Sequence, residues 1–154
     1  MFPERRPRRL RRTEAIRRMV RETHVRVDDL VYPIFVKEGS SIEEPIASMP
    51  GQSRYSPDRV AAVAKRAASL KIPAVLLFGI PRRKDATGTS AFQHDGVIQQ
   101  AVRRIKDAAP DLVVITDVCL CEYTDHGHCG ILDESGTVLN DETIEVLCRV
   151  AVSH

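Results

Sequence analysis

Three apolar runs, separated by segments of helical periodicity, dominate the pattern of hydrophobic and polar positions along the chain. They are LVYPIFV at residues 30–36, AVLLFGI at 74–80 and LVVITDV at 112–118. Because the runs are nearly continuous and do not alternate, each predicts a β-strand buried on both faces, as in a parallel sheet. Pro33 donates no hydrogen bond, so we expect it at an edge, at a bulge, or where the neighbouring strand does not need its amide.

Amphipathic segments follow each of the three runs. Ser56, Pro57 and Asp58 form a helix start with a hydroxyl cap, a first-position proline and a first-turn carboxylate. A second helix is predicted from about residue 95, and Asn140 is predicted to cap a third. The expected buried stripes are Val60, Val63, Ala64 and Ala67, then Val97, Ile98, Ala101, Val102 and Ile105, then Ile144, Leu147, Cys148 and Ala151. Cys148 is therefore predicted to be a core thiol.

The segments between these elements are predicted to be loops. Residues 37–55 are rich in turn formers and read as one long loop, and residues 129–139 carry a hairpin signal. Residues 82–90 predict a mobile loop, whose cations Arg82, Arg83 and Lys84 are either solvated or hold an anionic substrate group.

The order strand, loop, helix, repeated three times, predicts an α/β fold with a parallel sheet. The strand starts near 30, 74 and 112 suit successive β-α-β units of an open doubly wound sheet or of an eight-stranded barrel. A complete barrel needs roughly 250 to 330 residues. With 154 residues, the chain supplies three to four such units over residues 28–154.

Charge is distributed unevenly along the chain. The net charge is +2, but residues 1–26 hold ten arginines against three glutamates, which is +7 and leaves −5 for the rest. We predict a basic N-terminal arm over residues 1–27, with a short helix at 13–23 that has Ile16, Met19 and Val20 on one side. The arm either binds an acidic face of another subunit or is a solvated tail; nucleic-acid binding is disfavoured because no aromatic residues interleave with the arginines.

Composition also bears on location. The chain is 43% hydrophobic and 29% charged, which is typical of a globular protein. We find no apolar run near the roughly twenty residues that span a bilayer and no secretory signal. A soluble cytoplasmic protein without a membrane partner is expected.

Three of the four cysteines lie within residues 117–130, directly after the third predicted strand. Cys119 and Cys121, two apart on an extended backbone, are expected to point to the same side, and Cys129 returns after a short loop. The spacing C-x-C-x7-C supplies three sulfur ligands and leaves the fourth position of a tetrahedral zinc site open, as in catalytic sites. Inert or redox-active thiols, or a Cys119–Cys129 disulfide, are the alternatives, although cytosolic chains rarely keep disulfides.

Two of the five histidines, His126 and His128, lie in the same segment. Each is either a fourth ligand, a hydrogen-bonding neighbour of the ligands, or an ordinary loop histidine. Asp117 ends the third predicted strand, so it and the cysteines are expected at the carboxyl end of the sheet, where parallel α/β proteins place their chemistry.

The segment DVCLCEYTDHGHCG at residues 117–130 closely resembles the zinc loop of the porphobilinogen synthase, or delta-aminolevulinic acid dehydratase, family. Asp125 stands where many members have serine, a change that leaves the three thiols intact. Other segments resemble the family in the same order, so that the resemblance covers essentially the whole chain: RLRR at 9–12, MVRET at 19–23, DLVYPIFV at 29–36 followed by EG at 38–39, SMPG at 48–51, LF at 77–78 and NDET at 140–143.

The resemblance implies a (β/α)8 TIM barrel whose N-terminal arm wraps a neighbouring subunit in a homo-octamer. It implies a hydro-lyase that joins two molecules of 5-aminolevulinate into porphobilinogen, an early step of tetrapyrrole and haem biosynthesis. Cys119, Cys121 and Cys129 are then the zinc ligands, Asp117 lines the active site, and His128 belongs to the surroundings of the metal. Members that lack zinc carry aspartate and alanine in this loop, so the resemblance implies zinc dependence.

The resemblance also exposes a missing part. The family forms Schiff bases through two lysines in its second half, and none of the lysines here matches their motifs: Lys37, Lys65, Lys71, Lys84 and Lys106. We therefore expect the 154 residues alone to be inactive in the condensation. We also expect poor solubility or dependence on the missing half, because open edges of apolar strands invite aggregation. The alternative is a non-catalytic zinc-binding or assembly module, an inactive truncated relative.

Overall fold

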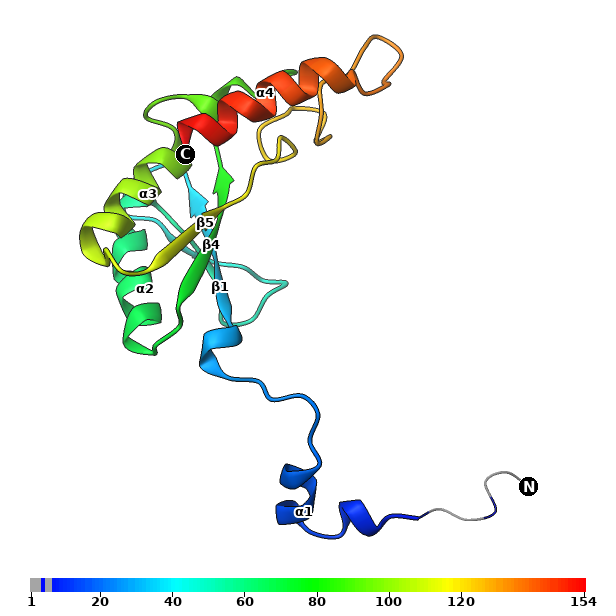
Figure 1. The fold of residues 1–154 in the computed structure, drawn as a ribbon. Helices are drawn as coiled ribbons and strands as arrows, with labels where there is room; N and C mark the ends of the chain where they lie inside the picture. Colours follow the sequence, from blue (N-terminus) through cyan, green and yellow to red (C-terminus); the bar gives the residue numbers. More distant parts are fainter. Residues whose placement is uncertain (1–3, 5–6) are drawn as a thin grey trace.

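The computed structural model describes residue 4 and residues 7–154, and a five-stranded sheet lies at its centre (Figure 1). Parallel pairs join β1 to β3, β1 to β4 and β4 to β5, whereas β2 pairs antiparallel with β3. The predicted α/β fold is confirmed, and its three predicted strands, β1, β4 and β5, are parallel as expected, whereas β2 makes the sheet mixed. Its strands are β1 Val31–Lys37, β2 Glu43–Pro45, β3 Ser53–Tyr55, β4 Ala74–Ile80 and β5 Val113–Thr116, in the order β2-β3-β1-β4-β5.

The prediction of one long loop over residues 37–55 was wrong, because this segment contains β2 and β3. Each of these strands has three residues, too few for a period-two pattern to stand out. β3 forms through a non-local pairing, in which Arg54 and Tyr55 lie opposite Phe35 and Val36 of β1. Since β3 reaches β1 only from Phe35 onward, Pro33 faces a strand on one side only, which accounts for a proline within the sheet.

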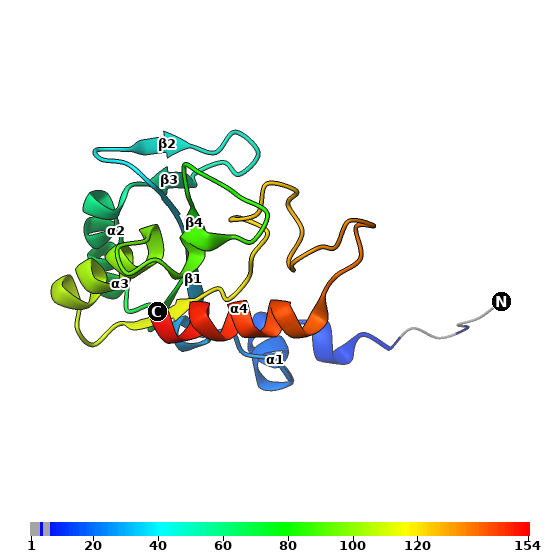
Figure 2. The same ribbon diagram turned by 90° about the horizontal axis from the view of Figure 1, so that it is seen from above.

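Helices α2 Pro57–Ser69 and α3 Val97–Ala108 lie on the same face of the sheet and contact each other (Figures 1 and 2). Their stripes are largely as predicted, with Val63 and Val102 only half-buried. Each large apolar side chain that is fully buried contributes about 1.5–3 kcal/mol. The core between helices and sheet includes Ile34, Val36, Val60, Ala64, Ala67, Val75, Leu77, Val97, Ile98, Ala101 and Ile105.

The stripe predicted for the last helix, α4 Asn140–Ser153, was mostly wrong, since Leu147 alone of its four residues packs against the core. Its buried residues are Thr143, Val146 and Val150, whereas Ile144 and Cys148 are exposed. Apolar residues surround much of this helix, so periodicity could not select its buried face. The face is set by tertiary contacts with the 3-10 helix Thr89–Phe92 and with α3, where Gln99 donates to Ser153 Oγ at 2.8 Å. Cys148 is consequently not a core thiol.

Asn140 does not cap α4, contrary to the prediction. The capping position is Leu139, which makes no side-chain cap, and Asn140 is the first helical residue. Its amide donates to the Asp141 carboxylate at 3.1 Å instead.

The N-terminal arm runs away from the sheet (Figure 1). It contains the 3-10 helix Arg9–Arg11, the helix α1 Glu14–Met19 and the 3-10 helix Val27–Asp29, and none of the three has a buried residue. α1 is shorter than the predicted helix at 13–23, although Thr13 caps it by accepting the Ile16 N–H at 3.2 Å. Met19 is 85% exposed. Arg5 and Arg6 of the predicted arm lie outside the described residues.

Among the described residues, we find no helix long and apolar enough to cross a bilayer.

Candidate metal centre

The cysteine segment, residues 117–130, begins where β5 ends at Thr116, at the carboxyl end of the parallel strands. The Asp117 N–H donates to the Leu77 carbonyl at 3.3 Å, which ties the start of the segment to β4. The position expected from the strand order is thus the one that the structure shows.

A tight turn, not an extended strand, brings Cys121 next to Cys119. The predicted strand at 112–118 stops two residues early, and the Leu120 carbonyl accepts the N–H groups of Tyr123 and Thr124, both at 2.8 Å. Leu120, Tyr123 and Thr124 are buried and anchor the turn in the protein. The two thiols do face each other, but strand alternation is not the reason.

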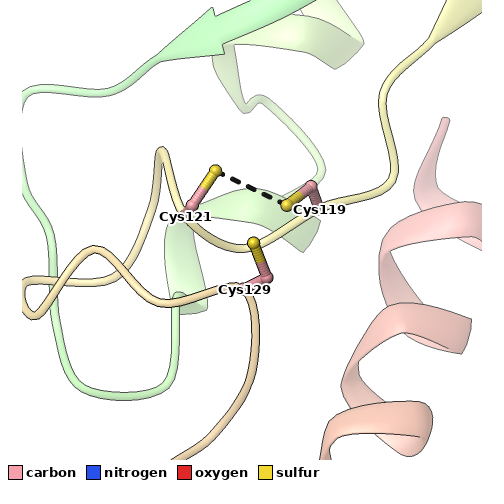
Figure 3. A group of neighbouring side chains, drawn as sticks. All are labelled: Cys119, Cys121 and Cys129. Carbon is pink, nitrogen blue, oxygen red and sulfur yellow. Dashed lines mark hydrogen bonds between the residues drawn. The ribbon is translucent and has the colours of Figure 1, made fainter.

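The three thiols of the segment converge (Figure 3). Cys119 Sγ and Cys121 Sγ are 3.5 Å apart, and the sulfur atoms of Cys119, Cys121 and Cys129 all lie within 4.8 Å of one another. All four cysteines of the chain are free thiols, so the structure contains no Cys119–Cys129 disulfide. Two sulfur ligands of one tetrahedral zinc ion would be about 3.8 Å apart, given Zn–S bonds of about 2.3 Å. The sulfur spacing therefore fits a shared metal ion.

The surroundings of Cys121 and Cys129 favour the protonated thiols. Burial, with a hydrogen bond from Cys121 Sγ to Glu122 at 3.1 Å, raises the pKa of the Cys121 thiol. The hydrogen bond with Cys119 raises the pKa of the Cys129 thiol. Because only the thiolate is a good metal ligand, an incoming ion must displace these protons.

Two carboxylates lie beside the thiols. Ligand atoms of Asp117, Cys119 and Glu122 form a second group whose members are within 4.8 Å of one another. Burial, followed by the negative charge of Glu122, raises the pKa of Asp117. Asp117 was predicted from the sequence, whereas Glu122 was missed; its one sequence signal is its position next to Cys121.

The two histidines do not enter either group of ligand atoms within the described part of the chain. His126 Nε2 lies 3.3 Å from the Ala86 carbonyl oxygen, and its Nδ1 accepts the backbone N–H of His128 at 3.1 Å. His126 thus shapes the loop between Cys121 and Cys129. A role for His128 in the surroundings of the metal stays a prediction.

A pocket of about 400 Å³ lies elsewhere, between β1, β3 and α2. Its lining includes Tyr32, Tyr55, Arg59, Arg66 and Leu70, and no cysteine. Residues 117–130 are therefore the candidate site because their side chains can ligate a metal ion, and not because they line this pocket.

Comparison with known proteins places these features in context. The model of the family described as delta-aminolevulinic acid dehydratase matches residues 4–154. Proteins of that name from Halalkalibacterium halodurans and Synechocystis are each 52% identical to the chain, over 148 and 156 residues. These matches cover 96% and 99% of this chain but 45% and 48% of the relatives. The chain thus spans about half the length of the curated relatives it matches.

A solved structure agrees with this result. The crystal structure of delta-aminolevulinic acid dehydratase (porphobilinogen synthase) from Toxoplasma gondii ME49, in complex with the reaction product porphobilinogen, superimposes with a TM-score of 0.89 at 37% identity. The match covers 97% of this chain and 43% of that one. The predicted fold class, the N-terminal part of a TIM barrel preceded by an arm, is confirmed.

Proposed function

Because the chain belongs to the delta-aminolevulinic acid dehydratase family, we propose that it provides the metal-binding part of a porphobilinogen synthase. The reaction is the condensation of two 5-aminolevulinate molecules to porphobilinogen, a hydro-lyase step of haem biosynthesis. The observation that carries the proposal is the convergence of Cys119, Cys121 and Cys129 at the carboxyl end of the sheet.

Zinc is the metal that we propose for this site. Thiolates are soft ligands and favour zinc over magnesium or calcium. Three protein ligands leave a fourth position free, which is the arrangement of catalytic zinc sites. Bound there, zinc would supply a Lewis acid for a substrate carbonyl or amine, or for a water molecule.

The carboxylates next to the thiols would serve the substrate. Asp117 and Glu122 lie beside Cys119, where a molecule entering the open position would meet them. Because burial raises the pKa of Asp117, this group is closer to proton exchange at neutral pH than an exposed aspartate. We assign Asp117 to the lining of the active site and His128 to the surroundings of the metal.

The covalent half of the reaction requires lysines that this chain does not supply. A Schiff-base lysine needs a lowered pKa and a free amine, whereas Lys37 pairs with Glu44 at 2.5 Å and Lys106 donates to the Leu112 carbonyl at 3.2 Å. We propose that residues 28–154 form the first three to four β/α units and that condensation needs the lysine-bearing half of the family's barrel. One alternative is a non-catalytic zinc-binding or assembly module.

Zinc titration combined with a colorimetric pyrrole assay tests these proposals. We expect one zinc ion per chain, no porphobilinogen from the 154 residues alone, and product when a lysine-bearing second half of the family is added. Product from the chain alone contradicts the dependence on that half. Zinc uptake without product under both conditions supports the assembly module, and failure to bind zinc contradicts the metal site.

For the arm, residues 1–27, we propose docking on another subunit of a homo-octamer. Its charge of +7 over residues 1–26 and its lack of buried residues in the described part support this role. We further propose a cytoplasmic location, where three reduced thiols persist and can bind a metal.

A further inference from the structure

Thr124 lies in the middle of the loop that separates Cys121 from Cys129, and it is fully buried. Its hydroxyl Oγ1 is 2.8 Å from the His128 carbonyl oxygen and 3.1 Å from the Leu120 carbonyl oxygen. These carbonyls belong to the residues directly before Cys129 and Cys121. One hydroxyl therefore bridges the backbone at both cysteines, and the shorter contact favours donation to His128.

A second loop holds this turn from outside. The Asp85 N–H donates to the Tyr123 carbonyl at 3.3 Å, and the Asp85 carbonyl accepts the Asp125 N–H at 3.2 Å. Asp85 thus pairs, like a neighbouring parallel strand, with the residues on both sides of Thr124. The loop at 82–90, which the sequence predicts to be mobile, is tied to the cysteine segment at this point.

The Asp85 side chain fixes its own loop. Its carboxylate accepts the backbone N–H groups of Thr87 and Thr89 at 3.0 and 3.1 Å and is also contacted by both threonine hydroxyls. These bonds, led by that from the Thr89 hydroxyl, lower the pKa of Asp85 to about 2. The carboxylate is therefore ionised at neutral pH, where charge-assisted hydrogen bonds are strong.

Close packing joins the two loops. Gly88 has a φ of +63°, and a Cβ atom there would lie 3.3 Å from Leu120 Cδ2 and 3.3 Å from Tyr123 Cβ. A side chain at this position would therefore be crowded as well as strained, so glycine suits the close contact of the two loops. His126 adds a third link through the Ala86 carbonyl.

We propose that Thr124 and Asp85 are positioning residues that hold the three thiols at metal-binding distance before an ion arrives. Neither side chain belongs to the groups of ligand atoms. The Thr124 hydroxyl contacts the backbone next to Cys121 and Cys129, whereas the Asp85 carboxylate orders its own loop, whose backbone pairs with Tyr123 and Asp125. Ordering this loop in advance removes part of the entropy cost that metal binding would otherwise carry. This inference rests on the proposed metal site and extends it to residues that sequence analysis did not select.

The test compares the affinity of the purified protein for Zn²⁺ and Co²⁺ across four variants. Thr124→Val keeps the shape but removes the hydroxyl, and Thr124→Ser restores it. Asp85→Asn removes the negative charge of the carboxylate that orders the loop at 82–90. Asp133→Asn is the matched control. The Asp133 carboxylate also accepts hydrogen bonds, from the N–H and hydroxyl of Ser135 and from the N–H of Thr137, but all of these lie within its own loop.

We expect Thr124→Val and Asp85→Asn to weaken metal binding by about 10- to 100-fold, the usual effect of removing a partner that orients metal ligands. Thr124→Ser should recover most of the affinity, and Asp133→Asn should leave it within about twofold of the wild type, which is below the range for such partners. Unchanged affinity in both Thr124→Val and Asp85→Asn overturns the inference. An equal loss in Asp133→Asn also overturns it, because general destabilisation would then be the cause.

Amide hydrogen exchange in the metal-free protein gives a readout that does not depend on metal. We expect faster exchange at residues 123–128 in Thr124→Val and Asp85→Asn, and wild-type exchange there in Asp133→Asn. Unchanged exchange in both variants means that Thr124 and Asp85 do not order the loop, which overturns the inference. A wild-type chain that shows no cobalt–thiolate absorption contradicts the proposed metal site instead, and the exchange data then decide the ordering of the loop separately.

Discussion

Cys119, Cys121 and Cys129 form a candidate site because buried residues between them anchor the segment while the thiols stay accessible. Leu120, Tyr123 and Thr124 are between 0% and 4% exposed, whereas Cys129 is exposed and the other two thiols are half-buried. At the scale of single residues, buried side chains fix the backbone between the cysteines, and the three thiols are held close enough to share a metal ion. Glu122 and Asp117 then place negative charge beside it.

Replacing one thiol tests the ligand set. We expect Cys129→Ser to weaken zinc binding by at least about 100-fold and to abolish cobalt–thiolate absorption, because a hydroxyl is a poor ligand for a soft site. Cys148→Ser is the matched control, since Cys148 is exposed on α4 and lies outside the thiol group. Equal zinc affinities of the two variants would contradict the three-thiol site.

Zinc binding should depend steeply on pH. The pKa values of Cys121 and Cys129 are raised above their ordinary value, so both thiols carry protons at neutral pH and release them to bind zinc. With at least two protons released, affinity should rise at least about 100-fold per pH unit between pH 6 and 7.5. Titration calorimetry in buffers of different ionisation enthalpy counts the protons released, and a value below two would contradict this assignment.

The raised pKa values of Cys121 and Cys129 also determine how the stability of the metal-free protein changes with pH. Folded-state pKa values that are raised favour the protonated thiols, so this contribution is present below the ordinary thiol pKa of about 8.5 and is lost as pH rises above it. Metal-free protein should therefore lose stability in alkaline solution, as followed by urea unfolding at pH 7 and pH 10. Protein that is more stable at pH 10 would contradict the shift.

At the scale of elements, Tyr123 connects the cysteine segment to β4 and α3. A Cβ atom added at Gly79 of β4 would clash with the Tyr123 hydroxyl and would lie 2.8 Å from Ile98 Cγ1 of α3. Because Gly79 has no side chain, it leaves room for the hydroxyl of the buried Tyr123. The strand, the helix and the metal segment meet at this position.

Gly79→Ala should destabilise the protein by about 1–3 kcal/mol, the usual cost of overpacking a core. It should also weaken zinc binding, because Tyr123 lies between Cys121 and Cys129 in the chain. Tyr123→Phe in the same background should restore part of the stability, since it removes the clashing oxygen. Urea denaturation measures both effects, and a double variant no more stable than Gly79→Ala would contradict this packing account.

At the scale of the whole molecule, β5 is an edge strand of the sheet formed by the described residues. Val113 and Ile115 of β5 are 54% and 39% exposed, and Ile144 and Val152 of α4 are also exposed. Val114 packs against the core, so the exposed pair lies on the opposite face of the strand. An edge strand with an apolar face promotes association with other chains.

We expect the 154 residues to self-associate at micromolar concentration, and Val113→Lys to reduce the association because charged residues protect sheet edges. Sedimentation velocity across a concentration series measures the change. Thr137→Lys, in the exposed turn after Asp133, is a control for the added charge. A cooperative unfolding transition of monomeric wild-type protein would contradict this prediction.

Much of the fold and part of the site could be predicted from the sequence. Continuous apolar runs marked β1, β4 and β5, and helical spacing marked the buried faces of α2 and α3, because burial of these residues is a local property of the pattern. The thiols of Cys119, Cys121 and Cys129 were found from their spacing and family resemblance. By contrast, β3 depends on pairing with Phe35 and Val36, and a three-residue strand carries too little local signal.

The sequence by itself determined the ligand chemistry, the order of the elements and the family to which the chain belongs, since these follow from residue identity and position along the chain. Tertiary structure alone decided which face of α4 is buried, why Cys148 is exposed, and that Glu122 lies beside the thiols. It also brought Asp85 against Thr124 across 39 positions of the chain. Such contacts join segments whose local patterns are unrelated, so they become visible only when the sheet has placed the two loops side by side.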